Sequence, residues 1–414
     1  NNWESCFGGS AWTDDDAAGL RYLSLFDETQ ADLNWDTEAV REDVYEMMNW
    51  WLEKGIDGFR MDVINMVSKP PGWPDGDPEG DWVGIEQFTN GPDAVDYLTE
   101  MAAATYDGHD AMTVGECVNV DPETASDYVR EDGPMDMLFH FEHMAVDQDG
   151  QWLSPSEWDL TELKSIISKW QTELDGWNSL YLSNHDQPRT VSHFGDDGEY
   201  RRESAKLLGT LLFTLSGTPY IYQGQEIGMT NYPWSSLDEL DDLQSIGKVE
   251  AAIEAGEIDG FEEVKQAVRD RSRDNARTPM QWDDSEGAGF TDGEPWLPVN
   301  PNHDEINAAA AERDPESILH YYRDLVALRT EHDVLVYGEY TLLVPDHESV
   351  WAYRMALDGD AVLVVLNVDT SETTVTVEGA AAADDVLLSN YDDAMPADAT
   401  LTLRPYEARV YRLW

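Results

Sequence analysis

Short apolar segments alternate with amphipathic helical segments through most of this 414-residue chain. Short buried strands separated by helices indicate a parallel sheet with helices on its faces. The pattern therefore predicts an α/β fold for this part of the chain. Strands are expected in segments 58–63, 111–115, 137–141, 179–183 and 218–222.

The helices have recognisable signals at their ends. The first is expected to begin at Asp36 as N-cap and to end at Gly55. Helical segments are also expected across 235–274 and 315–330. Residues 1–30 are expected to form loops, because glycines and a run of aspartates break any period. The apolar face of the first helix is predicted from Val40, Val44, Met47, Met48 and Trp51.

The pattern changes near residue 335, where Gly, Thr and alternating β-branched residues begin to dominate. Such alternation with turns at short intervals is typical of an antiparallel β domain. We therefore expect a boundary near residue 335, with strands in 361–368, 373–377, 400–403 and 408–414.

The number of strands also matters. A closed (β/α)₈ barrel needs eight strands, and five are predicted before residue 335. Each βαβ unit takes roughly 30 residues or more, so about 90 residues of a barrel are missing from the count. The chain also begins with Asn1 and not with Met. The expectation is the C-terminal part of a longer protein.

The charge excludes several classes of partner. The chain has 85 acidic residues against 25 Lys and Arg, a net charge of −60. Such a field repels nucleic acids and anionic membrane surfaces, and no apolar run is long enough to span a bilayer. Disorder is excluded, because 41% of the residues are hydrophobic and 11% aromatic.

The acids are spread along the whole chain, which indicates a solvated acidic surface and not an acidic tail. Their mutual repulsion destabilises a compact state at low ionic strength. Molar salt shortens the Debye length to about 3 Å and removes most of that repulsion. We therefore expect a halophilic protein from a salt-loaded cytoplasm; an ordinary acidic protein is the alternative.

Cysteine usage indicates neither a disulfide framework nor zinc. Cys6 and Cys117 are far apart, and no Cys/His cluster has metal-ligand spacing. Both are expected to be buried thiols.

Three acids directly follow predicted strands, namely Asp62, Glu116 and Asp186. In a parallel barrel the C-terminal strand ends form one rim, where active sites are built. Like charges on one rim are costly to ionise together, which suggests that the three acids have a function there. Glycoside hydrolysis needs one carboxylate as nucleophile or base and one protonated acid. Each acid taken alone is also consistent with a solvated loop residue in so acidic a chain.

The neighbours of these acids distinguish the two interpretations. Segments 58–65, 114–116 and 184–186 resemble three ordered motifs of glycoside hydrolase family 13, the α-amylase family. Segments 30–34, 217–224 and 277–282 resemble its oligo-1,6-glucosidase subfamily. The resemblance extends over essentially the whole chain, and with the acidic composition it suggests a haloarchaeal type.

The resemblance implies a role for each carboxylate. Asp62 is expected to be the nucleophile that forms a β-glucosyl ester. Glu116 is expected to protonate the leaving oxygen and then to activate water, for which its pKa must be raised. Asp186 is expected to hold sugar hydroxyls and favour distortion of the ring. Arg60 is expected to keep Asp62 ionised by charge pairing.

The same resemblance implies contacts to the sugar. His185 and Arg277 are expected to bind the glucose in the pocket. A core histidine is the alternative for His185, and a structural ion pair is the alternative for Arg60. Val63 follows the nucleophile, and valine there accompanies activity on α-1,6 links in the subfamily; a core valine is the alternative. Two departures are Ala31, where the family has proline, and residues 117–119, which leave the acceptor subsite open.

The implied fold is α/β, a (β/α)₈ TIM barrel present here from about strand 4 to strand 8, followed by a C-terminal antiparallel β-sandwich domain. Residues 1–35 would be a remnant of loop domain B, 36–335 the barrel and 336–414 the β domain. The missing part would carry a further sugar-binding Asp and His and a Ca²⁺ or Mg²⁺ loop, so no cofactor or metal site is expected in this chain. The chain alone is expected to be weakly folded or inactive.

The function implied is a retaining exo-acting α-glucosidase on terminal α-1,6, and in addition α-1,4, bonds of short oligosaccharides. The alternatives are a transglucosylase, a non-catalytic relative of family 13 and an inert fragment. The expected partner is the oligosaccharide substrate, with no nucleic acid and no membrane. The expected location is a high-salt cytoplasm, and the sequence does not indicate an oligomeric state.

Overall fold

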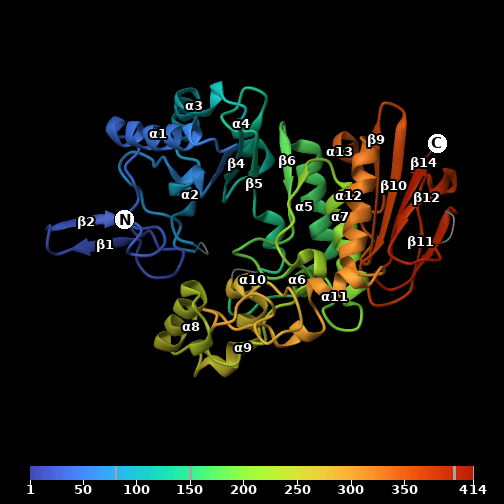
Figure 1. Ribbon diagram of the computed structural model, residues 1–414. Coiled ribbons are helices and arrows are strands. Elements are labelled where there is room, and N and C mark those ends of the chain that lie inside the picture. Colours follow the sequence, from blue (N-terminus) through green and yellow to red (C-terminus); the bar gives the residue numbers. More distant parts are fainter. Residues whose placement is uncertain (80–81, 149–151, 395–397, 414) are drawn as a thin grey trace. The chain divides into compact units, whose positions relative to one another are not determined.

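The computed structural model describes residues 1–79, 82–148, 152–394 and 398–413 (Figure 1). The chain divides into two compact units. The first unit is Asn1–Ala145 with Glu173–Ser179, and the second is Val146–Thr172 with Leu180–Trp414. The division at residues 35 and 335 stays a prediction.

Parallel strands form the centre of the first unit. They pair in chain order, with Met61 opposite Gly115 and Val114 opposite Met137. Predicted and observed strands agree, although the first, third and fourth are shorter than predicted, the second is shifted by one residue and the fourth begins two residues earlier. The strands are β3 (Gly58–Met61), β4 (Met112–Glu116), β5 (Met137–Phe139) and β6 (Trp177–Leu180).

Helix α1 (Glu38–Glu53) corrects two details of the prediction. Thr37, not Asp36, is the N-cap residue, and the buried face is built from Tyr45, Met48 and Leu52, which recur at the helical period. Two residues predicted to face the core, Met47 and Trp51, are exposed. The other helices of this unit are α2 (Ile85–Phe88), α3 (Ala94–Ala104) and α4 (Pro122–Val129), with single 3₁₀ turns at Ile64–Met66, Tyr106–Gly108 and Glu142–Met144.

The expectation of loops across residues 1–30 was wrong for one segment. Strands β1 (Trp12–Asp15) and β2 (Leu20–Leu23) form an antiparallel hairpin. The Asp15 carboxylate accepts hydrogen bonds from the amides of Ala17 and Ala18, and Gly19 has a positive φ. The acidic and glycine residues that seemed to break the pattern therefore build the turn of the hairpin.

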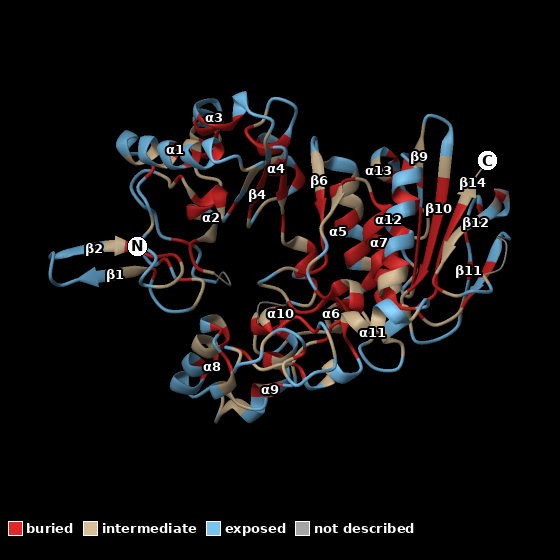
Figure 2. Cartoon of the chain, viewed as in Figure 1, coloured by how far each residue is buried: buried red, intermediate tan, exposed pale blue. Residues whose placement is uncertain are grey.

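Helices dominate the first part of the second unit. Helix α7 is almost entirely buried, as Figure 2 shows by its red ribbon. The helical insert predicted at 235–274 is confirmed as α8 and α9, and the predicted helix at 315–330 as α12. The helices are α5 (Leu160–Glu173, ending at the unit boundary), α6 (Thr190–Phe194), α7 (Arg201–Thr214), α8 (Leu243–Ala255), α9 (Phe261–Arg271), α10 (Asp274–Arg277), α11 (Ala308–Arg313), α12 (Ile318–Glu331) and α13 (Val334–Tyr337), and the short strand β7 is Thr218–Pro219. Single 3₁₀ turns lie at Gln225–Ile227, Leu237–Glu239 and Pro301–Asp304.

The second unit ends in two antiparallel sheets, which confirms the predicted β-sandwich. The larger sheet has the strand order β12-β14-β10-β9-β8, and β11 pairs with β13. Buried side chains of both sheets, among them Val365 and Leu401, form one core. The strands are β8 (Glu339–Leu342), β9 (Val350–Leu357), β10 (Asp360–Asn367), β11 (Thr373–Thr376), β12 (Ala383–Ser389), β13 (Thr400–Leu403) and β14 (Ala408–Leu413), with a 3₁₀ turn at Ala380–Ala382.

The two cysteines differ from each other. Cys117 is fully buried, as predicted, and burial raises the pKa of its thiol. Cys6 is only partly buried, because it lies in the loop that precedes the hairpin.

In the described part of the chain, every helix is too short or too polar to cross a membrane.

Candidate active site

The first candidate group lies where two neighbouring parallel strands end. Asp62 directly follows β3, and Glu116 is the last residue of β4. The register places Met61 beside Gly115. Parallel pairing therefore brings the two acids to the same edge of the sheet, as the sequence predicted.

One guanidinium joins both carboxylates. Arg60 donates from Nη1 to Oδ1 of Asp62 and from Nη2 to Oε2 of Glu116. The side chain of Asp62 is 73% exposed, whereas that of Glu116 is 11% exposed. We call these three residues the Arg60 cluster. It holds one accessible carboxylate and one buried carboxylate around a single positive charge.

The backbone beside Asp62 is strained. Val63 has φ 34° and ψ 41°, in the left-handed region that β-branched residues rarely adopt. A 3₁₀ turn, Ile64–Met66, follows at once. This conformation reverses the chain directly after Asp62, and strain of this kind concentrates at functional sites.

A network of asparagines fixes the loops behind this cluster. Asn65 is fully buried, and its Nδ2 donates to the carbonyl of Val118 at 2.7 Å and to Oδ1 of Asn90 at 2.9 Å. Asn90 in turn donates to the carbonyl of Asn119 at 2.8 Å. The loop after Asp62 and the loop after Glu116 are thereby held to each other.

The second candidate group lies beyond β6, in the second unit. Contrary to the prediction, Asp186 does not directly follow the strand, because β6 ends at Leu180. Arg277 donates from Nη2 to Oδ1 of Asp186 and from Nε to the carbonyl of His185 at 3.0 Å. His185 Nε2 lies 3.3 Å from Asp186 Oδ2, and Arg273 Nη1 lies 3.6 Å from Asp186 Oδ1. We call these four residues the Asp186 cluster. Its carboxylate side chain is 28% exposed and is contacted by two cations, which fix its orientation.

Two fully buried aspartates lie behind these arginines. Asp242 Oδ1 accepts a hydrogen bond from Arg273 Nε at 3.0 Å, and Asp274 Oδ1 lies 3.8 Å from Arg277 Nη1. Burial raises the pKa of Asp274 above its ordinary value, although its hydrogen bonds from backbone amides oppose that shift. Each arginine therefore lies between Asp186 and a buried carboxylate.

The structure brings the predicted residues together in two sets. Arg60, Asp62 and Glu116 meet in the first unit, with Val63 beside them. His185, Asp186 and Arg277 meet in the second unit. Sequence reasoning missed three residues, Asn65, Arg273 and Asp242. Arg273 precedes Arg277 by four residues, one helical turn, which is a spacing that could have indicated a shared partner. Asp242 is 31 residues from Arg273, so their contact leaves no local spacing pattern in the sequence.

The described residues contain no group of three or more His, Cys, Asp or Glu side chains arranged to hold a metal ion. The side chains of the two clusters are carboxylates, arginines and one imidazole.

Comparison with known proteins identifies the class. The chain matches the family of the α-amylase catalytic domain over residues 1–338 and the C-terminal domain of the α-amylase SusG over residues 350–410. The fold is that of an α-amylase-type TIM-barrel enzyme with a C-terminal β domain, as the sequence predicted. The chain belongs to the α-amylase family.

Individual relatives are also similar over the full chain. An oligo-1,6-glucosidase of Parageobacillus thermoglucosidasius is 47% identical over 428 residues, covering 100% of this chain and 75% of that protein. A crystal structure of a Bacillus licheniformis trehalose-6-phosphate hydrolase has 43% identity and a TM-score of 0.91, over 100% of this chain and 75% of its own. A crystal structure of isomaltulose synthase from Klebsiella sp. LX3 has 40% identity and a TM-score of 0.95, over 100% of this chain and 75% of its own.

Proposed function

We propose that the protein is a retaining exo-acting α-glucosidase that hydrolyses terminal α-1,6, and also α-1,4, glucosidic bonds of short oligosaccharides. The observation that supports this most is the Arg60 cluster, in which one guanidinium binds two carboxylates at adjacent strand ends. Retaining enzymes hold their two carboxyl groups about 5–5.5 Å apart, a spacing that suits a shared arginine.

The reaction follows from the different surroundings of the two acids. Asp62, which is exposed, attacks the anomeric carbon while Glu116 gives its proton to the departing glycosidic oxygen. The bond to the leaving sugar breaks as the ester to Asp62 forms. Glu116 then takes a proton from water, whose oxygen displaces the carboxylate of Asp62. Two inversions give glucose with its original anomeric configuration.

The Asp186 cluster has a binding role in this proposal. A carboxylate contacted by two arginines has its charge offset and its orientation fixed, which makes it a poor nucleophile and suits it to bind sugar hydroxyls. His185 and Arg277 supply donors beside it. We propose that these residues bind the hydroxyls of the glucosyl unit and favour its distortion.

Val63 is the proposed determinant of linkage preference. Val63 lies next to Asp62 and has a strained backbone, so its side chain contributes to the shape of the site beside that carboxylate. The test is the kcat/KM of the protein on isomaltose, maltose, sucrose and trehalose 6-phosphate. The proposal sets aside the expectation of a weakly folded or inactive chain: it expects turnover, with isomaltose as the best substrate. A clear preference for maltose overturns the linkage assignment, and no turnover of any α-glucoside overturns the function.

A transglucosylase is the second candidate, and the similarity to isomaltulose synthase favours it. In that case another sugar, not water, accepts the glucosyl group from Asp62. The ratio of transfer product to free glucose at rising sugar concentration distinguishes the two. Hydrolysis that persists at high acceptor concentration supports the glucosidase.

The acidic composition supports the proposal that the protein works in a salt-loaded cytoplasm. The net charge of −60 gives strong self-repulsion unless salt screens it. Melting temperature measured from low to molar KCl tests this. Stability should rise with salt, and greater stability at low salt contradicts the proposal.

A further inference from the structure

A buried arginine lies three residues beyond Asp186 and has no role in the chemistry above. Arg189 precedes α6 and is only 2% exposed. It forms no ion pair with a described carboxylate, and burial lowers its pKa to about 10. Burying a cation without a counter-charge is costly, so its hydrogen bonds must offset a large desolvation penalty.

Those hydrogen bonds surround Arg277. Arg189 Nε donates to the carbonyl of Asn275 at 2.9 Å, and Nη2 donates to Oγ1 of Thr278 at 3.3 Å. The remaining nitrogen, Nη1, donates to the carbonyl of Gln223 at 2.7 Å. Asn275 and Thr278 stand on either side of Arg277 in the chain, so the guanidinium holds the segment that carries this side chain.

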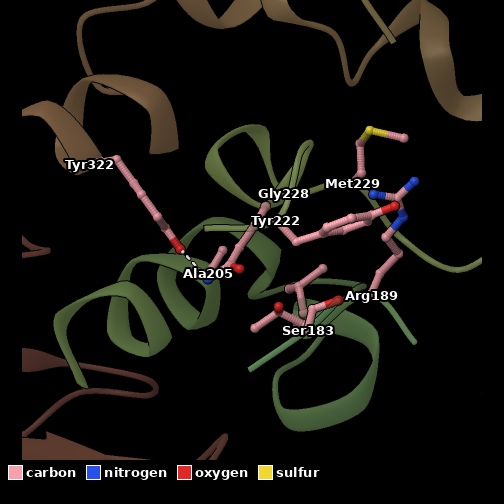
Figure 3. A pocket seen from close by; sticks show the side chains of 10 residues that line it. Ser183, Arg189, Ala205, Tyr222, Gly228, Met229 and Tyr322 are labelled. Carbon is pink, nitrogen blue, oxygen red and sulfur yellow. Dashed lines mark hydrogen bonds between the residues drawn. The ribbon is translucent and has the colours of Figure 1, made fainter. Parts of the chain in front are cut away.

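Neighbouring groups keep the guanidinium in place. The centre of the Arg189 guanidinium lies 5.6 Å from the centroid of the Tyr222 ring, and the Tyr222 hydroxyl donates to the carbonyl of Ala276 at 3.0 Å. Figure 3 shows Arg189 beside Tyr222 and Met229. A Cβ on Gly224 would lie 2.3 Å from Met229 Sδ and 3.1 Å from Arg189 Nη1. The cavity that these side chains line measures about 10 Å³, room for roughly one water molecule.

The contacts form a closed path. Asp186 binds Arg277, and Arg189 donates hydrogen bonds to residues on either side of Arg277. Arg189 in turn lies only three positions after Asp186 in the chain. We propose that Arg189 is a positioning residue, which fixes Arg277 against Asp186 and so determines how tightly the Asp186 cluster binds the sugar. This inference rests on the proposed function of that cluster.

Arg189→Lys is the primary test, because lysine keeps the charge but loses the planar fork that reaches Asn275 and Thr278 together. A displacement of about 1 Å near a reacting sugar can cost roughly 100-fold, so kcat/KM should fall about 10- to 100-fold. In an Arg277→Ala background, the same change should cost less than about threefold, because coupled residues are not additive.

The matched control is Arg329→Lys. Arg329 is also buried, donates only to backbone carbonyls among the described residues, and has its pKa lowered by burial to about 10. Its partners, Phe213, Leu215, Gly217 and Leu335, lie outside the Asp186 cluster. This variant should lose thermal stability and keep its kcat/KM.

Three measurements separate the outcomes. Turnover of p-nitrophenyl α-glucoside by the unmodified protein tests the function itself, and its absence overturns both proposals. With turnover present, additive losses in the Arg189→Lys and Arg277→Ala double variant overturn the positioning role alone. The inhibition constant of 1-deoxynojirimycin, a cationic glucose mimic, should rise in Arg189→Lys; an unchanged constant with only a lower melting temperature also overturns it.

Discussion

The two clusters use the same residue types in opposite proportions. In the Arg60 cluster one arginine serves two carboxylates, and one of them is largely exposed. In the Asp186 cluster two arginines serve one carboxylate, and each of them also faces a fully buried aspartate. The first arrangement leaves one carboxylate largely open to solvent, while the second places two cations around a carboxylate that is mostly covered.

This difference separates reactivity from binding. A carboxylate with one hydrogen-bonding cation and an open side keeps the lone pairs that nucleophilic attack needs. A carboxylate fixed by two cations gives up that reactivity for a defined orientation. The comparison predicts that substitutions in the first cluster remove chemistry, and that those in the second mainly weaken sugar binding.

The largest effect is expected for Asp62→Asn. Removing the nucleophile should lower kcat by a factor on the order of 10⁴ or more, since the residual rate comes from binding alone. Steady-state kinetics on p-nitrophenyl α-glucoside measures this. The control is Asp57→Asn, an exposed acid before the opposite end of β3, which should leave kcat unchanged. Near-normal turnover by Asp62→Asn would falsify the assignment of roles.

Glu116→Gln is expected to show the next largest effect. Loss of the general acid should cost about 10²- to 10⁴-fold on isomaltose. The first step on p-nitrophenyl α-glucoside should suffer less, because p-nitrophenolate leaves without protonation. Comparing kcat/KM on the two substrates checks this, and equal losses on both contradict the role of Glu116 as proton donor.

The two arginines of the Asp186 cluster should differ in a graded way. Arg277→Ala removes a charge-assisted hydrogen bond to Asp186, worth about 1.5–3 kcal/mol, so kcat/KM should fall roughly 10- to 100-fold. Arg273→Ala removes a longer contact of 3.6 Å and should cost less. The reverse order of the two effects would show that Asp242, and not Asp186, sets the importance of this pair.

The smallest effect is expected for Asp274→Asn, and it concerns stability. Burial raises the pKa of Asp274 in the folded state, so the folded state binds its proton more tightly than the unfolded state does. This contribution to the free energy of unfolding is therefore present below the ordinary Asp pKa, about 3.9, and is lost as the pH rises through the raised value.

Asp274→Asn should consequently lose less stability than the unmodified protein between pH 4 and pH 7. Urea unfolding across that range measures the difference. Asp292→Asn, at an exposed site, is the control and should follow the unmodified protein. A steeper fall in Asp274→Asn would contradict the sign.

The sheet and the first cluster could be predicted because both depend on chain order. Parallel strands end at one edge, so residues that directly follow successive strands must be neighbours. Asp62 and Glu116 satisfy this rule without any knowledge of packing. The buried face of α1 was less well predicted, because Tyr45, Met48 and Leu52 compete with other apolar residues for one helix face.

The buried partners could not be predicted, because their contacts do not follow any local period. Asp242 and Arg273 are 31 residues apart, and a solvated loop is the ordinary expectation for an aspartate in so acidic a chain. Arg189 is similar, since its hydrogen bonds reach residues 223, 275 and 278.

By itself the sequence determined the α/β order, the C-terminal β domain and the strand ends at Asp62 and Glu116, because apolar periodicity and turn residues act over a few positions. Only the tertiary structure decided how many cations each carboxylate receives and which charges are buried behind them. Those features depend on side chains that meet from distant segments, where desolvation and hydrogen bonding, and not local propensity, set the free energy.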